Sequence, residues 1–135
     1  KKEPVKVSQS NLEENKISVT AVSEYIQERS DPNIPLYLFG YHINIVNNED
    51  ANIKLVRRHW DIIDGNGNLN TVNGDGVIGK QPLIAPGENF EYSSFCPIPT
   101  EFGIMKGYYI ITDMQDQEYK INIPAFNLIA PNSMN

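Results

Sequence analysis

The sequence predicts an all-β fold, an antiparallel two-sheet β-sandwich of the immunoglobulin or fibronectin-type-III kind with about seven strands in one domain. Three observations carry this prediction. Apolar and polar residues alternate along several strand-length segments, as they do when successive side chains point to opposite faces of a sheet. Clusters of Gly, Asn, Asp and Pro separate these segments. No window of about twelve residues has the periodicity of an amphipathic helix.

The first two expected strands span residues 16–26 and 36–46, joined by the polar connection 27–35 with its two prolines. The first alternates through Ile17, Val19 and Ala21. The second places an apolar side chain at every second position and predicts a buried face of Tyr37, Phe39, Tyr41, Ile43 and Ile45.

Residues 53–64 predict a central strand with two contrasting faces. Trp60 belongs to the apolar face, with Val56 and Ile62, while Arg57, His59 and Asp61 share the other face. The Asp64-Gly65-Asn66-Gly67 sequence that follows predicts a hairpin, because Gly and Asn accept the positive φ angles of tight turns. We expect 69–73 to return as a short strand.

The second half of the chain predicts a loop over 74–87 and further strands over 88–95, 103–112 and 119–123. The last two strands are expected to form a hairpin around 113–117. The sandwich domain is expected over 16–131, between a polar N-terminal arm (1–15) and a frayed C-terminal tail (132–135).

The net charge of −6 disfavours nucleic acid and anionic membranes as partners. No stretch reaches the length of roughly 18 apolar residues that a membrane span needs. The lone cysteine, Cys96, cannot form an internal disulfide and fits a reducing compartment, so we expect a cytoplasmic protein. No cofactor is expected.

A glycine-rich segment contains Gly74, Gly76 and Gly79 in the spacing G-x-G-x-x-G, followed by Lys80. A dinucleotide-binding fold is a poor interpretation, because two prolines follow within the next eight residues, Lys80 to Gly87, and prevent a helix. Two interpretations remain. The segment is a structural connection with positive φ angles, or it is an anion-binding nest of backbone N–H groups assisted by Lys80.

Arg57, Arg58 and His59 form the other candidate ligand-binding group. Alternation sends Arg57 and His59 to one face and Arg58 to the face of Trp60. The polar face is either simply solvated or a binding patch, because exposed Arg side chains make strong hydrogen bonds. His42 could be a cross-strand neighbour of His59, but no set of residues has the spacing of a metal site.

No nucleophile, base and acid converge in the sequence in a way that predicts an enzyme. Ser93 and Ser94 lack a G-x-S-x-G motif, and Cys96 has no evident base or charge beside it. Binding is therefore the expected mode of action.

The block from Arg58 to Tyr92 resembles the ApaG family, with its R-x-W strand, D-G-N-G hairpin, V-x-G-x-G-V-x-G segment and Q-P-x-[IL]-x-P-G-E-x-F-x-Y segment. Two later segments, Gly103 to Tyr109 and Ile123 to Leu128, resemble the family's G-x-M-x-G-x-Y and I-P-x-F-x-L. The resemblance covers Lys16 to Pro131. It implies a fibronectin-type-III-like sandwich and a genetic link to cobalt tolerance and magnesium efflux.

Family relatives in eukaryotes imply a protein-binding module, and the family's glycines have suggested pyrophosphate or nucleotide binding. The function expected here is therefore a non-enzymatic, regulatory protein–protein interaction. The alternative is binding of a phosphorylated small molecule through residues 74–80, and a direct role with Mg²⁺ or Co²⁺ is a third hypothesis. The protein is expected to be a monomer or a homodimer joined at edge strands.

Overall fold

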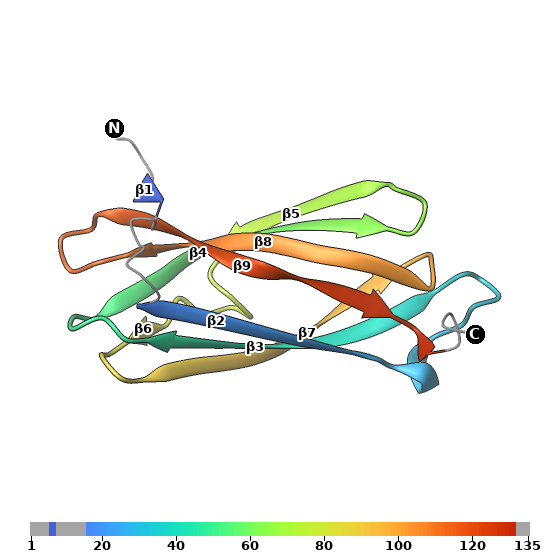
Figure 1. Ribbon diagram of the computed structural model, residues 1–135, viewed down its shortest axis with the longest axis horizontal. Helices are drawn as coiled ribbons and strands as arrows, with labels where there is room; N and C mark the ends of the chain where they lie inside the picture. The colour runs from blue at the N-terminus through green and yellow to red at the C-terminus, as the bar shows by residue number, and fades with distance from the viewer. Residues whose placement is uncertain (1–5, 8–15, 132–135) are drawn as a thin grey trace.

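The computed structural model describes residues 6–7 and 16–131 and shows a sandwich of two sheets (Figure 1). The larger sheet has the strand order β1 (Lys6–Val7), β9 (Glu118–Ile129), β8 (Phe102–Thr112), β4 (Ile53–Asp64) and β5 (Leu69–Asp75), and β6 (Leu83–Ile84) pairs with the start of β4. The smaller sheet has the order β2 (Ile17–Tyr25), β3 (Tyr37–Asn47) and β7 (Asn89–Ile98).

All strand pairs in the described residues are antiparallel except β1 with β9. The predicted fold class is therefore confirmed. Only β1 and β6 are two-residue strands, which leaves seven longer strands in the described part of the chain. A single turn of 3₁₀ helix, η1 (Gln27–Arg29), lies in the connection with two prolines. Among the described residues, no helix is long and apolar enough to span a membrane.

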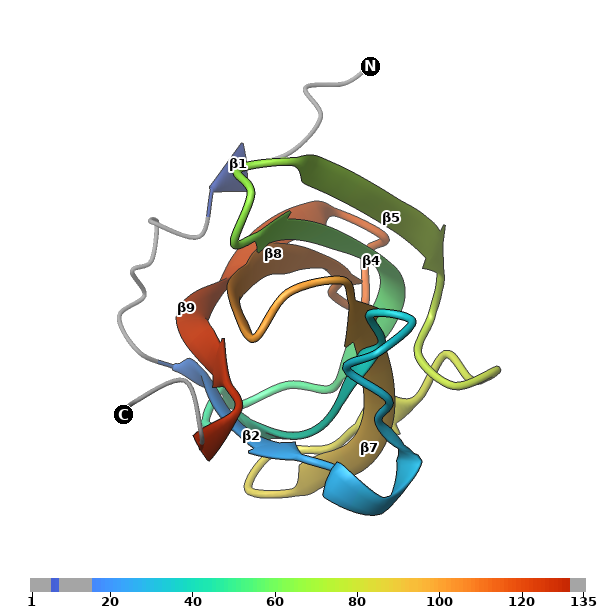
Figure 2. The ribbon, with the colours of Figure 1, turned by 90° about the vertical axis from the view of Figure 1, so that its right-hand side faces the viewer.

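The core lies between the two sheets, and β3 supplies its centre. Phe39, Ile43 and Ile45 are at most 1% exposed, as their alternation predicts. Trp60 of β4 faces them from the larger sheet and is 2% exposed. Burying each such side chain contributes roughly 1.5–3 kcal/mol. The end-on view shows the two sheets wrapped around this core, with β2 beside β9 along one side (Figure 2).

A β-bulge in β4 changes which residues face the core. Leu55 pairs with Ile111 and Arg57 pairs with Ile110, so Val56 is an extra residue. Leu55 is consequently fully buried and Val56 only half-buried, which corrects the prediction that Val56 belongs to the buried face. Beyond the bulge the predicted alternation resumes, with Trp60 inside.

A second bulge interrupts the pairing of β8 with β9. Met105 pairs with Phe126 and Gly107 with Ile123, so the two residues Pro124 and Ala125 lie opposite Lys106 alone. A bulge accommodates proline because the extra residues need not donate a hydrogen bond to the ladder. As a result β9 continues well past the predicted end at residue 123.

Several predicted boundaries differ from the structure. The expected loop over 74–87 is shorter, because β5 includes Gly74 and Asp75 and because Leu83–Ile84 forms β6. Of the predicted arm, Lys6–Val7 pairs with β9 in parallel. The rest of the arm and the predicted tail 132–135 lie outside the described residues.

Candidate functional site

The glycine-rich segment forms a tight turn after β5. Val77 and Lys80 exchange two backbone hydrogen bonds, of 2.8 and 2.9 Å, around the central residues Ile78 and Gly79. Both central residues have positive φ, 41° and 79°, as in a type I′ turn. Gly76 has a φ of 59°, and a Cβ atom there would lie 2.0 Å from the Lys80 carbonyl oxygen. Glycine is therefore required at position 76 by the turn itself.

The turn uses several of its backbone amides internally. The Gly76 amide donates to the Val56 carbonyl oxygen over 2.7 Å, in addition to the two amides that close the turn. In the part of the chain that the structure describes, the Ile78 and Gly79 amides donate no hydrogen bond. An anion nest needs several neighbouring amides pointing outward. The anion site at Gly74, Gly76, Gly79 and Lys80 stays a prediction, supported by two adjacent amides only.

Arg58 braces this segment from the neighbouring strand. Its Nη1 atom donates to the carbonyl oxygens of Asp75 and Gly76, over 3.1 and 3.0 Å. The guanidinium group also lies against Gly74, where a Cβ atom would come within 2.7 Å of it. The structure thus brings together the predicted site residues Arg58, Gly74 and Gly76. The guanidinium group of Arg58 is used to fix the backbone of the turn and is not free to bind a ligand.

A polar cluster lies in the core near Arg58. The hydroxyl groups of Tyr92 and Tyr109 form a hydrogen bond of 2.5 Å. Burial raises the pKa of both tyrosines, so both stay neutral at physiological pH.

Burial also raises the pKa of the Cys96 thiol to about 11, which keeps it in the unreactive protonated form.

Arg57 and His59 lie on the outer face of the larger sheet, as predicted, and away from Arg58. Arg57 forms an ion pair with Glu118 over 3.0 Å. The His59 ring nitrogens lie 2.6 Å from Asn73 Oδ1 and 3.1 Å from Asp61 Oδ1. In the described residues, Lys80 shares no hydrogen bond or ion pair between side chains with Arg57, Arg58 or His59. The predicted binding group is therefore divided between two places: Arg58 lies against the glycine-rich turn, and Arg57 and His59 lie on the outer face of the larger sheet.

On this outer face, three side chains from neighbouring strands stack on one another: His59 of β4, Tyr108 of β8 and Lys120 of β9. The His59 ring lies on the Tyr108 ring with centroids 4.6 Å apart and planes 10° from parallel. The Lys120 Nζ atom lies 4.5 Å from the centroid of the same tyrosine. Because β8 lies between β4 and β9, the histidine and the lysine approach Tyr108 from its two sides. Sequence reasoning missed Tyr108 and Lys120, since their meeting depends on strand order.

His42 is not a neighbour of His59, and that prediction is wrong. His42 belongs to β3 in the smaller sheet and His59 to β4 in the larger one. Both point outward, so the sandwich core lies between them. Among the described residues, no group of three or more His, Cys, Asp or Glu residues could hold a metal ion.

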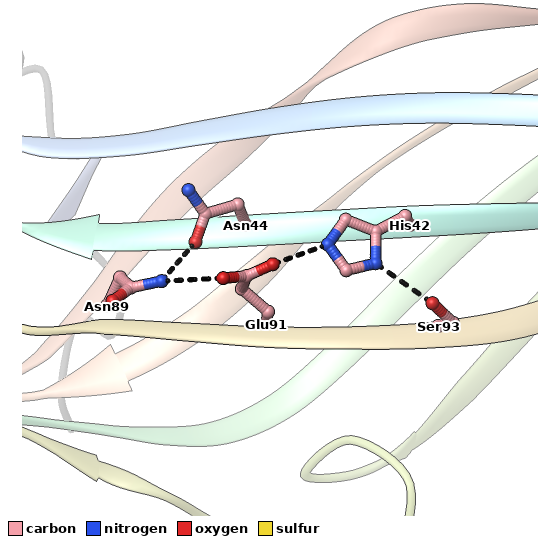
Figure 3. A network of polar contacts seen from close by, with 5 residues as sticks. All are labelled: His42, Asn44, Asn89, Glu91 and Ser93. Atoms are coloured by element: carbon pink, nitrogen blue, oxygen red, sulfur yellow. Dashed lines mark hydrogen bonds and ion pairs between the residues drawn. The ribbon is translucent and has the colours of Figure 1, made fainter.

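His42 instead belongs to a chain of hydrogen bonds on β3 and β7 (Figure 3). Its Nδ1 atom lies 2.9 Å from Ser93 Oγ, and its Nε2 atom lies 2.7 Å from Glu91 Oε1. Asn89 donates to Glu91 over 3.1 Å and to Asn44 over 2.8 Å. This serine–histidine–carboxylate chain corrects the expectation that no such residues converge. The register of β3 with β7, which pairs His42 with Ser93, produces it.

Two further features share the outer face of the larger sheet. The first, here called the outer hollow, has a volume of about 360 Å³ and is lined by Asp61, Lys106, Gly107, Tyr108, Lys120, Asn122, Ile123 and Ala125. The second, here called the apolar patch, consists of side chains that pairing places side by side at one end of the sheet: Ile63, Leu69, Phe102, Ile104 and Ile129. Four of them are 40–63% exposed, and Ile63 is half-buried.

Comparison with known proteins identifies the family. The pattern that defines the ApaG domain matches residues 27–113. The chain is 43% identical over 118 residues to Protein ApaG of Agrobacterium fabrum, covering 87% of this chain and 91% of that protein. It is 45% identical over 115 residues to Protein ApaG of Allorhizobium ampelinum, covering 85% and 88% of the two chains.

A solved structure has the same fold. The crystal structure of the putative ApaA protein from Bordetella pertussis superimposes with a TM-score of 0.83 at 39% identity, covering 85% of this chain and 94% of that one. The family pattern covers more than half of the chain, and the identities hold over most of its length. The chain therefore belongs to the ApaG family.

Proposed function

We propose that this chain is a non-enzymatic binding module that recognises another protein through the outer face of its larger sheet. The apolar patch carries the proposal. Leu69 and Phe102 are 63% and 51% exposed, and Ile104 and Ile129 are each 40% exposed. Water covers these side chains in the free protein, and a partner that displaces it gains the hydrophobic free energy. Contiguous exposed apolar side chains are typical of protein-binding surfaces.

The glycine-rich turn supports the alternative, a phosphorylated small molecule, less well. Its amides close the turn, and Arg58 is bonded to its carbonyl oxygens. An anion would therefore find Lys80 and two amides, few donors compared with known phosphate-binding loops. In this proposal, the link to cobalt and magnesium that the family implies acts through the bound protein.

The serine–histidine–glutamate chain on β3 and β7 is compatible with binding rather than catalysis. Its His42 and Glu91 side chains are 47% and 53% exposed, so water competes for every hydrogen bond in the chain. Acyl transfer by a serine uses preorganised donors for the oxyanion and a site that excludes water. An open sheet face supplies neither shelter nor a wall for a substrate.

The test is retention of a partner from native extract on the immobilised full chain. The double variant Leu69→Asp/Ile104→Asp places charges in the apolar patch. Val22→Asp is the matched control, because Val22 is a 66% exposed apolar residue on the smaller sheet. We expect a specific protein to bind the unchanged chain and Val22→Asp, and to be lost from the double variant. Equal retention by all three would refute this binding face, and the absence of any specific protein would refute the function.

A further inference from the structure

We propose that the outer hollow is a subsite for an acidic side chain. The bound partner would then present an extended segment with a carboxylate or phosphate group close to an apolar residue. This inference rests on the proposed function and deepens it by naming the chemistry of the partner.

The hollow lies at the bulge in β9, because Lys106 and Ala125 of the bulge are among its lining residues. Pro124 and Ala125 together lie opposite Lys106, so the regular pairing of β8 with β9 is interrupted there. Gly107 and Ala125, which carry little or no side chain, are among the residues that line the hollow. A Cβ atom at Gly107 would lie 2.0 Å from the His59 carbonyl oxygen, so the close approach of β4 and β8 requires glycine there. Bulges of this kind commonly re-aim side chains at functional surfaces.

Two lysines provide the positive charge of the hollow. Lys106 and Lys120 both line it, and neither forms an ion pair among the described residues. The Lys120 ammonium group is placed by its contact with the Tyr108 ring, which in turn is stacked on His59. This contact restricts the positions that the ammonium group samples, which lowers the entropy lost on binding. On a protein of net charge −6, such a pair of lysines favours an anion locally.

The one carboxylate in the lining does not cancel this preference. Asp61 Oδ1 lies 3.1 Å from His59 Nε2 and accepts a hydrogen bond from Thr71 Oγ1 over 3.0 Å. Asn122, on the opposite side of the hollow, adds an amide that can donate. The hollow thus offers two ammonium groups and one amide against a single carboxylate, of which one oxygen, Oδ1, is already engaged. Carboxylate and phosphate oxygens match that set of donors.

The spacing of the hollow from the apolar patch defines the ligand further. Ile104 and Lys106 are two positions apart on β8, so they share a face at a separation of roughly 7 Å. Alternate residues of an extended peptide have the same separation. A peptide along β8 would therefore place an acidic residue over the hollow and an apolar residue, two positions away, over Ile104. The hollow is shallow and open to solvent, which suits a side chain of a peptide that lies along the sheet better than an enclosed cofactor.

The experiment selects ten-residue peptides from a random display library on the immobilised full chain. The variant Lys106→Glu/Lys120→Glu reverses the charge of the hollow. Lys54→Glu is the matched control, because Lys54 is an exposed lysine near the start of β4 and does not line the hollow. For the unchanged chain and the control, we expect at least about tenfold enrichment of sequences with an acidic and an apolar residue two positions apart. The double variant should lose this preference or select basic residues.

A second measurement separates the two possible anions. A selected peptide is compared by fluorescence anisotropy with versions in which its acidic residue is glutamine or phosphoserine, and with inorganic phosphate as a competitor. Glutamine should weaken binding about tenfold. Tighter binding of the phosphoserine peptide would assign the subsite to phosphate, and tighter binding of the original would assign it to a carboxylate. Equal binding of the acidic and glutamine peptides would overturn the inference.

The outcomes also distinguish the subsite from the proposed function. No acidic preference, or a preference unchanged by Lys106→Glu/Lys120→Glu, overturns the subsite. If an extract protein is lost by Leu69→Asp/Ile104→Asp but retained by Lys106→Gln/Lys120→Gln, the binding function stands and the subsite does not. Denaturant unfolding of each variant confirms that it is folded, so that loss of binding is not loss of structure.

Discussion

Replacing Arg58 by methionine should destabilise the protein much more than the same change at Arg57. Methionine keeps most of the apolar stem and removes the guanidinium group. At Arg58 this deletes two hydrogen bonds, to the carbonyl oxygens of Asp75 and Gly76. At Arg57 it deletes one ion pair with Glu118, on the exposed face of the sheet. The two neighbouring arginines are thus a matched pair with opposite environments.

The magnitude follows from the two environments. A hydrogen bond from a charged group contributes about 1.5–3 kcal/mol when it is desolvated. One of the two Arg58 bonds is exposed and the other is half-buried, so we expect a total loss of roughly 2–3 kcal/mol for Arg58→Met. An exposed ion pair contributes at most about 1 kcal/mol, which limits the expected loss for Arg57→Met. For a chain of this size, the larger loss lowers Tm by roughly 6–12 °C.

Denaturant unfolding monitored by the fluorescence of Trp60 measures both variants. Trp60 is the only tryptophan in the sequence and is 2% exposed, so its emission reports on the core. The midpoint should fall for Arg58→Met with an unchanged slope, since the exposed area of the unfolded chain is the same. Equal losses for the two variants would refute the view that Arg58 braces the turn. So would a fully stable Arg58→Met protein that has instead lost affinity for pyrophosphate.

Three further predictions concern the core and the smaller sheet. Tyr92→Phe and Tyr109→Phe should each cost about 1–3 kcal/mol by leaving the other buried hydroxyl without its partner, whereas the double variant should cost clearly less than the sum in a double-mutant cycle. Because burial raises the pKa of Cys96 from 9.0 to about 11, the folded state keeps a proton that the unfolded state releases, so stability should fall as pH rises from about 9 to 11. Urea unfolding at pH 8 and pH 10.5 checks this, and Cys96→Ala should lose less stability over that interval. A fluorophosphonate probe should not label Ser93, and labelling that disappears in Ser93→Ala would contradict the non-enzymatic proposal.

The strands could be predicted from the sequence where a sheet has one buried face. The alternation through Phe39, Ile43 and Ile45 reflects that geometry directly, and all three are buried. The predictions failed at the two bulges, because one extra residue reverses the faces without changing the composition. Val56 and Pro124 are the residues concerned, and only the pairing of their strands with β8 reveals them.

The candidate site could be predicted from the sequence only in part, for a similar reason. The contact of Arg58 with Gly74 lies within one hairpin, so the turn over 64–67 determines which residues pair across it. The contact of His42 with Ser93 joins strands that are 51 residues apart, and nothing local in the sequence specifies that register. The outer hollow depends on both strand order and a bulge. Sequence reasoning therefore missed the residues whose contacts depend on the pairing of strands that are distant in the sequence.

The most direct test of the proposed binding face is an NMR titration of the full chain with the protein that it captures, followed through backbone amide chemical shifts. We expect the largest changes at Leu69, Ile104, Lys106 and Lys120, on the outer face of the larger sheet. Large changes confined to residues 76–80, or to His42 and its neighbours on the smaller sheet, would contradict the proposal that this protein binds through that face.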